Sequence, residues 1–456
     1  MSYLKLILLI TLLFVSAANA QILRVDEGVS KSTVSSKRER GLKMLTKIKE
    51  ILELYYYDKS YRGIDIDKKF SEARDQVKNL ETNADIFRVI AGVLLEFNDS
   101  HTRFYPPDRT NKVEYGFTLQ IIGDRCLVTD VTKGSDAEKQ GMSPGDIVTK
   151  IGQYPVTRDS LWVINYFIYQ LEPIPDLPIV VRKPNRPDRS LVIQASFKTL
   201  DERRQEAEKR RNEKAENPYK CAKLSPDTIA CKLRSFVVDK KMIDRMMTEV
   251  AGSKKLILDL RGNGGGYVRT EEYLTGHFFD RDVKIADMIT RKKTETMVAK
   301  PVAKRAFTGE LVVLIDSRSA SASELFSRVI QIEKRGKVVG DVSAGAVMTS
   351  YNMGLAVPGG SLQHMTFSPY GLNVSVADVI MSDGKRLEQM GVVPDHPVGP
   401  SSAAVAAKND PVLAFAAELM GVKLTPQEAG KLDFLYKKVE AEVDDDEDSK
   451  AGGEKQ

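Results

Sequence analysis

The stretch from Leu311 to Phe326, LVVLIDSRSASASELF, constrains the fold of this chain more than any other. It opens with the apolar run Leu311 to Ile315, which has the length and branching of a strand buried on both faces. Small residues follow, and from Glu324 to Glu333 apolar side chains recur at helical spacing. A strand that passes into a helix through small residues can present one hydroxyl beside the free N–H groups of the helix N-terminus. A serine nucleophile requires that setting.

The same residues also allow a structural interpretation. Ser321 and Glu324 have the spacing of a capping box, in which a hydroxyl and a carboxylate satisfy N–H groups at the start of a helix. Taken alone, the stretch therefore supports capping as well as catalysis. Other parts of the chain have to distinguish the two.

The composition is that of an ordinary globular protein. The chain has 456 residues, which allows about three domains, and 42% of its residues are hydrophobic and 29% charged. The net charge of +5 is small for this length, and basic residues do not gather with aromatic ones in any segment. We therefore expect no nucleic-acid partner.

The N-terminus has the pattern of a cleavable signal peptide. Lys5 precedes an apolar run from Leu6 to Val15, and Ala18-Asn19-Ala20 forms an A-x-A cleavage site. The apolar run is too short to span a membrane. The sequence predicts a signal peptide over residues 1–20 and an exported protein, periplasmic or extracellular, that is not an integral membrane protein.

Three cysteines give a weak framework. Cys221 and Cys231 flank a turn at Ser225-Pro226-Asp227 and could pair across a hairpin, while Cys126 lies in a strand pattern and would be left over. The sequence leaves that disulfide open. No cluster of cysteine and histidine has metal-ligand spacing, so we expect neither a metal nor another cofactor.

The rest of the chain divides into segments of different character. Residues 37–105 read as a helical region, in which Asn83 or Asp85 could cap the helix that runs to Phe97. Residues 199–218 form a charged helix or linker, and residues 219–400 alternate strands with helices, as in an α/β core. Residues 401–439 contain amphipathic helices, and the acidic tail, 440–456, is predicted to be disordered.

Residues 113–198 combine short strands with turns and resemble a PDZ domain. The segment YGFTL matches the carboxylate-binding loop, and SDAEKQGMSPGDIVTKIG and a helix near Ser160 to Gln170 follow in the expected order. PDZ domains bind an extended peptide as an added strand. The resemblance implies a peptide-binding loop that consists of Tyr115, Gly116, Phe117 and Thr118.

Four features together resemble the C-terminal processing peptidases and the tricorn-type serine peptidases. They are a buried strand before Arg261-Gly262-Asn263-Gly264-Gly265-Gly266, the SASASE segment, the ending LE-x-x-GVVPD at 387–395, and the PDZ-like insertion. The resemblance covers about residues 40 to 400. It implies a ClpP/crotonase-like core of parallel or mixed sheet with crossover helices.

The resemblance also implies site residues. The middle serine, Ser321, would be the nucleophile, and the oxyanion hole would consist of N–H groups from Gly264 or Gly265 and from Ala322. A glycine run lets the backbone turn its N–H groups inward. The alternative interpretation, a phosphate-binding loop, lacks the Gly-Lys-Ser/Thr ending and the dinucleotide spacing.

The chain lacks the lysine that serves as general base in the Ser–Lys peptidases, which it otherwise resembles. Those enzymes have a lysine 25 residues after the nucleophile, and Ala346 occupies that position here. The tricorn-type enzymes use a Ser-His pair with a distant glutamate, which implies His101 as base, Ser100 as its orienting partner and Glu388 as the carboxylate. Asp99 competes with Glu388, and His277, His364 and His396 are predicted to be structural.

The sequence therefore predicts an exported serine endopeptidase that cleaves extended or unfolded polypeptides through an acyl-enzyme on Ser321. The PDZ-like segment would bind the substrate. Two alternatives remain open: a catalytically inactive peptide-binding scaffold, and a Ser–Lys peptidase with a displaced lysine, Lys337 or Lys385.

Overall fold

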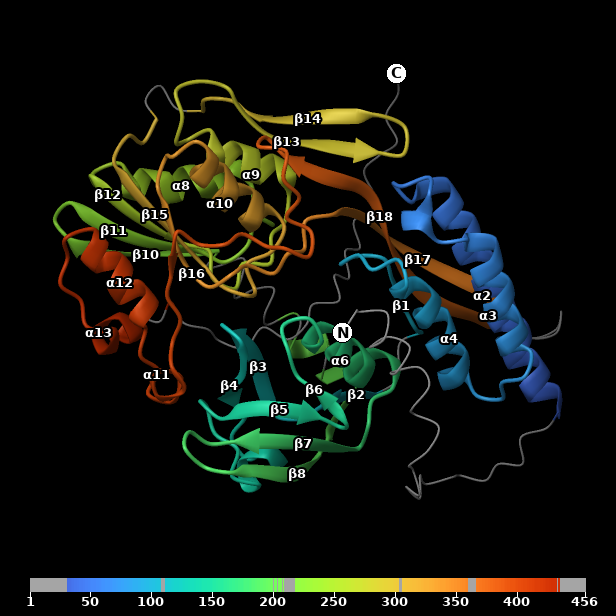
Figure 1. Ribbon diagram of the computed structural model, residues 1–456. Helices are drawn as coiled ribbons and strands as arrows, with labels where there is room; N and C mark the ends of the chain where they lie inside the picture. Colours follow the sequence, from blue (N-terminus) through green and yellow to red (C-terminus); the bar gives the residue numbers. More distant parts are fainter. Residues whose placement is uncertain are drawn as a thin grey trace.

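A six-stranded sheet forms the centre of the core region in the computed structural model, which describes residues 31–107, 111–199, 201–202, 204–206, 208, 218–302, 306–359, 366–432 and 434 (Figure 1). The strand order is β10-β11-β12-β15-β16-β19, and every neighbouring pair except β10 and β11 is parallel. These strands span Tyr219–Ser225, Thr228–Leu233, Lys255–Asp259, Glu310–Ile315, Lys337–Gly340 and His396–Pro397.

Helices cover both faces of this sheet, so its strands are buried on both sides. Leu256, Leu258 and Val313 face one hydrophobic cluster, while Ile257 and Val312 face another. The first cluster includes side chains of α8 (Lys240–Val250), α9 (Val268–Thr275) and α10 (Ala322–Ile332), and the second includes those of α12 (Pro411–Leu419). The continuous apolar runs predicted this arrangement. Two short helices, α11 (Ser402–Ala406) and α13 (Pro426–Lys431), flank α12.

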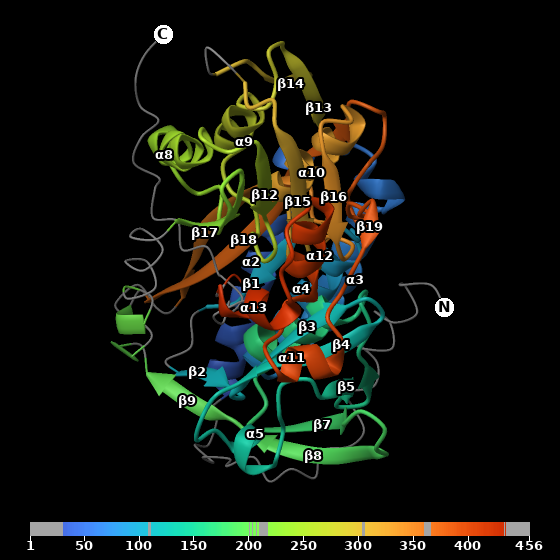
Figure 2. The same cartoon turned by 90° about the vertical axis from the view of Figure 1, so that its left-hand side faces the viewer.

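A second, antiparallel sheet connects the core to the N-terminal region. Its order is β1-β18-β13-β14, and β17 pairs with the opposite edge of the long strand β18. The strands span Arg103–Tyr105, Thr366–Met381, Val283–Thr290, Thr294–Ala299 and, for β17, Thr349–Gly359. Figure 1 and Figure 2 show β17 and β18 reaching from the core to the N-terminal helices.

The predicted helical region consists of three helices and a short 3₁₀ turn. These are α2 (Lys31–Tyr55), η1 (Tyr61–Gly63), α3 (Ile66–Val77) and α4 (Asn83–Leu95). Neither predicted cap of α4, Asn83 or Asp85, is its N-cap, because the hydroxyl of Thr82 accepts a hydrogen bond from the Asp85 N–H at 3.1 Å. Asn83 is instead the first residue of the helix. A threonine before the first turn is a common N-cap.

Residues 113–198, here called the β-unit, lie below the core sheet (Figure 2). Their main sheet has the order β3-β4-β5-β7-β8, with β6 paired to β5, and β2 pairs with β9 separately. The strands β2 to β9 span Asn111–Glu114, Phe117–Ile122, Arg125–Val131, Ile147–Ile151, Tyr154–Pro155, Asp176–Arg182, Asp188–Gln194 and Ser196–Thr199. The helices are α5 (Asp136–Lys139), α6 (Leu161–Asn165) and the π-helical η2 (Tyr166–Leu171). The identity of the β-unit as a PDZ domain stays a prediction.

The N-terminal helices and the β-unit share one hydrophobic core, although the sequence suggested separate domains. Leu45 and Ile90 from the helices belong to the same cluster as Val128 and Ile179 from the β-unit, and Leu372 of β18 also belongs to it. Since a domain has its own core, these two segments are better described as one packed body.

Several predictions concern residues outside the described part of the chain. They are the signal peptide over 1–20, His364 and the acidic tail over 440–456, together with most of the charged segment at 199–218. Within the described residues, no helix has the length and apolar character needed to cross a membrane.

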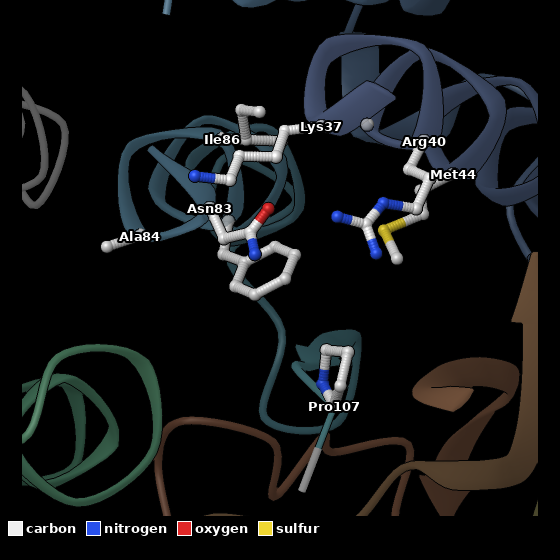
Figure 3. Close-up of a pocket in the computed structure, with 9 residues that line it drawn as sticks. Lys37, Arg40, Met44, Asn83, Ala84, Ile86 and Pro107 are labelled. Carbon is white, nitrogen blue, oxygen red and sulfur yellow. The ribbon is translucent and has the colours of Figure 1, made fainter. Parts of the chain in front are cut away.

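A cavity of about 320 Å³ lies between α2 and α4. Lys37 and Arg40 line it from α2, Asn83 from the start of α4, and Pro107 from the chain after β1 (Figure 3). None of the site residues predicted from the sequence lines this cavity.

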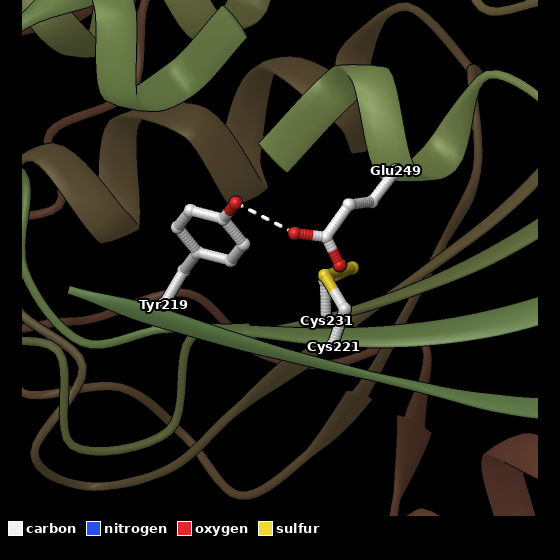
Figure 4. The surroundings of a disulfide bond; sticks show 4 residues. All are labelled: Tyr219, Cys221, Cys231 and Glu249. Carbon is white, nitrogen blue, oxygen red and sulfur yellow. Dashed lines mark hydrogen bonds between the residues drawn. A yellow bond between two sulfur atoms is a disulfide. The ribbon is translucent and has the colours of Figure 1, made fainter. Parts of the chain in front are cut away.

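A disulfide bond links β10, the first strand of the core sheet, to its neighbour β11. Cys221 on β10 lies directly opposite Cys231 on β11, and their sulfur atoms are bonded. The Tyr219 hydroxyl donates to Glu249 on α8 at 2.7 Å (Figure 4). The described structure thus answers the question that the sequence left open, and the third cysteine, Cys126, is free and buried.

We predict that removing this disulfide destabilises the folded protein. In the chain-entropy account, closing a loop of this length stabilises the folded state by about 3 kcal/mol. Urea unfolding of the Cys221→Ser/Cys231→Ser variant should therefore show a lower midpoint than the oxidised wild type. Reductant should lower the wild-type midpoint to that of the variant and leave the variant unchanged. Identical midpoints for oxidised wild type and variant would contradict the prediction.

Candidate active site

Of the three serines in the SASAS segment, only Ser321 has a hydroxyl that is available for chemistry. Ser319 and Ser323 are fully buried, and their hydroxyls donate to the backbone carbonyls of Leu260 and Asn263, each at 2.9 Å. Ser321 is half-buried, and its hydroxyl forms no cap of α10. The two flanking serines therefore hold the segment in place, and the hydroxyl of the middle serine forms no such bond.

Ser321 has a strained backbone conformation. Its φ is 53° and its ψ is −118°, outside the regions that L-residues normally populate. Its N–H donates to the carbonyl of Ala346 at 3.0 Å and to the carboxylate of Glu324 at 2.9 Å. Such strain persists only where surrounding contacts enforce it, and it is common at catalytic turns between a strand and a helix.

Glu324 occupies the position of the capping box that the sequence allows. Its carboxylate accepts the Ser321 N–H, and its own N–H donates to the Ser321 carbonyl at 2.8 Å. The fully buried carboxylate also accepts the hydroxyl of Ser343 at 2.6 Å and the N–H groups of Gly345 and Ala346 at 2.8 and 2.9 Å. Glu324 therefore joins the serine turn to the loop 343–346, a role that the sequence did not reveal.

The glycine loop after β12 lies directly against this turn. A β-carbon built on Gly265 would approach the Ser321 β-carbon at 2.7 Å and the Ala322 nitrogen at 3.1 Å, and Gly265 has a φ of +103°. Only glycine allows this contact. Asn263 holds the loop in place, because its backbone carbonyl accepts both the Ala320 N–H and the Ser323 hydroxyl.

Two N–H groups remain candidates for the predicted oxyanion hole. The Gly265 N–H donates to the Asn263 side chain at 2.9 Å, which leaves Gly264 as the candidate from this loop. Ala322 is the first residue of α10, so its N–H has no acceptor within the helix. Among the described residues, the Gly264 N–H has no acceptor either. Their function as an oxyanion hole stays a prediction.

Ser100, His101 and Glu388 form one hydrogen-bonded relay. The Ser100 hydroxyl lies 2.6 Å from His101 Nδ1 and donates to Glu388 Oε2 at 2.9 Å. The Ser100 N–H donates to Glu388 Oε1 at 2.7 Å. Since a hydroxyl has one proton and this one goes to the carboxylate, Ser100 accepts from Nδ1–H. This assignment leaves His101 Nε2 unprotonated and able to accept a proton.

Asp99 stabilises the loop that contains Ser100 and His101, and it forms no hydrogen bond with the imidazole ring. Its carboxylate accepts the backbone N–H groups of His101 and Thr102 at 3.0 and 2.6 Å. It also accepts the hydroxyls of Tyr56, Thr102 and Ser375 at 3.0, 2.9 and 2.9 Å. The geometry therefore favours Glu388 over Asp99 as the partner of the Ser100–His101 pair.

Residues 346–347 connect the relay to the serine turn. The Ala346 carbonyl accepts the Ser321 N–H, and the Val347 N–H donates at 3.0 Å to the Glu388 oxygen that Ser100 also contacts. Within the described residues, the Ser321 hydroxyl and the His101 ring are not hydrogen bonded. Catalytic hydrogen bonds are often long in substrate-free enzymes and shorten when substrate binds.

The environment tunes the ionisable groups of this site. Burial lowers the pKa of His101 from its ordinary value of 6.5 to about 4, Arg103 adds to the decrease, and Asp99 opposes it. Burial raises the pKa of Glu388, against the donors from Val347 and Ser100. Burial also raises the pKa of Glu324 to about 7, although its four donors favour the ionised form.

The lysines considered as alternative bases lie elsewhere. Lys337 and Lys385 are both exposed, and the buried Lys232 donates to the Arg261 carbonyl at 2.8 Å. Ala346, at the position of the lysine in Ser–Lys peptidases, touches Ser321 through its carbonyl. Of the remaining histidines, His277 is buried 3.4 Å from Asp244, and His396 lies on β19.

Comparison with known proteins points to a serine-type peptidase. Residues 230–398 match the family model described as peptidase family S41. Over these residues the chain is similar to peptidase family S41. The matched residues include the glycine loop, the serine turn and Glu388, whereas Ser100 and His101 lie outside them.

Curated relatives carry related names. The chain is 24% identical over 266 residues to a “Probable CtpA-like serine protease” of Staphylococcus aureus (strain bovine RF122 / ET3-1). The aligned region covers 56% of this chain and 50% of the relative. A protein of the same name from Staphylococcus haemolyticus (strain JCSC1435) is 23% identical over 279 residues. The chain spans about half the length of these relatives.

Solved structures show the same fold. “Structure of mature CPAF complexed with lactacystin” superposes with a TM-score of 0.62 at 13% identity, covering 87% of this chain and 99% of that one. “Crystal Structure of mature CPAF” gives the same TM-score at 12% identity and covers 96% of that chain.

We predict that the imidazole of His101 titrates near pH 4. Because the lowered pKa keeps the ring neutral at higher pH, its NMR ring signals should shift between about pH 5 and 3 and not near 6.5. The resonance is assigned by its loss in His101→Gln. A midpoint near 6.5 in the folded protein would show that the ring is not buried as the structure indicates.

We also predict that Glu324→Gln destabilises the protein strongly. The amide group replaces one acceptor oxygen with a donor, so N–H or O–H groups buried around it lose their partner, at a cost of about 2 kcal/mol or more. Glu428, which forms the same kind of capping box with Thr425 on the exposed helix α13, is the matched control. Thermal unfolding should be unchanged in Glu428→Gln, and equal effects of both substitutions would contradict the prediction.

Proposed function

We propose that this protein is an exported serine endopeptidase that cleaves extended or unfolded polypeptides. Ser321 is the nucleophile, His101 the general base, and Ser100 and Glu388 orient the base. The observation that carries the proposal is the free Ser321 hydroxyl on a strained turn, joined through residues 346–347 to the Ser100–His101–Glu388 relay.

In the first half of the reaction, Ser321 Oγ attacks the scissile carbonyl carbon while His101 Nε2 takes the hydroxyl proton. The imidazolium then gives this proton to the departing amine, and the C–N bond breaks to leave an acyl-enzyme. Water repeats the sequence and releases the acid. The relay supports the imidazolium, because Nδ1–H donates to Ser100, and Ser100 donates to the Glu388 carboxylate.

The negative oxygen of each tetrahedral intermediate would accept hydrogen bonds from the Gly264 and Ala322 N–H groups. Removing one such donor typically costs ~10²–10³ in rate. The α10 N-terminus adds a partial positive charge next to the same position. Glu324 has no contact with the reacting atoms and acts by holding the turn.

The β-unit would bind part of the substrate at its edge strand β3. Its predicted peptide loop is largely internal, since Tyr115 is buried with its hydroxyl donating to the Ile174 carbonyl at 2.9 Å, and Phe117 is buried too. The outer edge of β3 contacts the serine segment, because the carbonyls of Leu119 and Ile121 accept from Arg318 and Ser317 at 2.6 and 2.5 Å. Binding of a peptide there would require these contacts to open.

The nucleophile is tested with the mature protein, residues 21–456, and an unfolded substrate such as casein. The wild type should digest casein, and Ser321→Ala should lower the rate by at least about 10³-fold without changing the circular dichroism spectrum. Undiminished cleavage by Ser321→Ala would place the nucleophile elsewhere. An inactive wild type would favour the peptide-binding scaffold.

The base is tested by comparing three substitutions. His101→Ala should lower the rate by about 10²–10⁴-fold, as expected for loss of a general base. Lys337→Ala and Lys385→Ala should retain wild-type rates, because both side chains are exposed and take no part in the relay. A wild-type cleavage rate in His101→Ala, or a large loss of rate in either lysine variant, would contradict the assignment of His101 as the base.

A further inference from the structure

The strand β17 has one free edge. It pairs with β18 along its whole length, and among the described residues no other backbone group bonds to it. Tyr351, Asn352, Gly354 and Ala356 along it are exposed. A free edge presents a row of unpaired N–H and C=O groups, which is a template for another strand.

The features that normally protect an edge strand are missing over most of β17. Its sequence, TSYNMGLAVPG, has no charged residue, and its one proline, Pro358, comes next to last. Its single irregularity in pairing lies at the first two residues. Gly354, in the middle, has open space where a side chain would be, so another backbone can approach closely. An 11-residue edge of this kind is a predicted site of strand addition.

The position of β17 in the chain indicates what it pairs with. It begins two residues after Val347, whose N–H contacts Glu388, and three after Ala346, whose carbonyl accepts the Ser321 N–H. Its first residues also adjoin an apolar surface, because Tyr351 packs against the partly exposed Tyr55 with their ring centroids 6.5 Å apart. The strand thus begins within three residues of a direct hydrogen-bond partner of Ser321.

We propose that β17 is the docking strand for the substrate polypeptide. One side of the substrate, counted from the scissile bond, adds to the free edge of β17 as an extended strand, and backbone hydrogen bonds hold it with little regard to side-chain sequence. This inference rests on the proposed peptidase function and deepens it: the substrate class is an extended segment several residues long on one side of the cleavage site. The strand is roughly 35 Å long, enough for about ten residues.

Peptide kinetics provide the first test. Lengthening a peptide by up to about eight residues on one side of its scissile bond should raise kcat/KM stepwise, and lengthening the other side should not raise it in this way. Replacing successive backbone N–H groups on the responsive side by N-methyl groups should lower kcat/KM about 5- to 10-fold at every second position, because alternate N–H groups of a strand face its partner. Equal sensitivity at all positions, or none, would overturn the proposal.

Disulfide trapping assigns the binding to β17. The described cysteines leave no exposed thiol, since Cys126 is buried and Cys221 is bonded to Cys231. In a Ser321→Ala background, Ala356→Cys should trap a peptide whose single cysteine occupies one register position, because directly opposite β-carbons lie about 5 Å apart. Val192→Cys, on the exposed outer strand β8 of the β-unit, is the matched control and should not trap it.

The possible results separate the docking proposal from the proposed function. If the wild type cleaves casein and Ser321→Ala does not, but Ala356→Cys traps no more peptide than Val192→Cys, the docking proposal is wrong and the peptidase stands. Disulfide-linked dimers of Ala356→Cys without peptide would also overturn it, because the edge would then pair with a second copy of the chain. If short activated esters and casein are both left intact by the wild type, the peptidase function itself fails.

Discussion

The carboxylate of Glu324 is the interaction on which the geometry of the site depends. It is buried, and its acceptor sites receive three backbone N–H groups and one hydroxyl from two segments that are separate in the sequence and adjacent in the fold. One segment is the serine turn, and the other is the loop that continues to Val347 and Glu388. A buried carboxyl group that is fully hydrogen bonded holds its partners in one arrangement, since every displaced donor would be left unsatisfied. The strain at Ser321 is therefore maintained by Glu324 and Ala346 together.

Much of the core could be predicted from the sequence, because buried parallel strands have a distinctive pattern. The runs at Leu256–Leu258 and Leu311–Ile315 are continuous and apolar, and the structure places both in the central sheet. The long strand β18 was missed, since Pro369 and Gly371 interrupt it in a way typical of turns. Its pairing with β17 on one side and with β1 and β13 on the other compensates for these residues, and such long-range pairing has no local signal.

The site was predictable only in part. The resemblance to known peptidases pointed to Ser321, Ser100, His101 and Glu388, and the structure brings the last three into one relay. The anchoring role of Glu324 was hidden, because its spacing from Ser321 is also that of an ordinary helix cap. The five donors around Asp99 come from three separate segments, so no spacing in the sequence could have indicated them.

The core shared by the N-terminal helices and the β-unit has a consequence for motion. The contacts between the β-unit and the catalytic core include polar ones, such as Arg158 with Asp341 at 2.8 Å. Its contacts with the helices are mainly apolar, although Arg88 of α4 lies 3.6 Å from Glu172 of the β-unit. Polar contacts can be exchanged for water at small net cost, but separating packed apolar surfaces exposes them. The β-unit and the N-terminal helices should accordingly move together as one rigid body. We expect any hinge to lie at the polar boundary between the β-unit and the core.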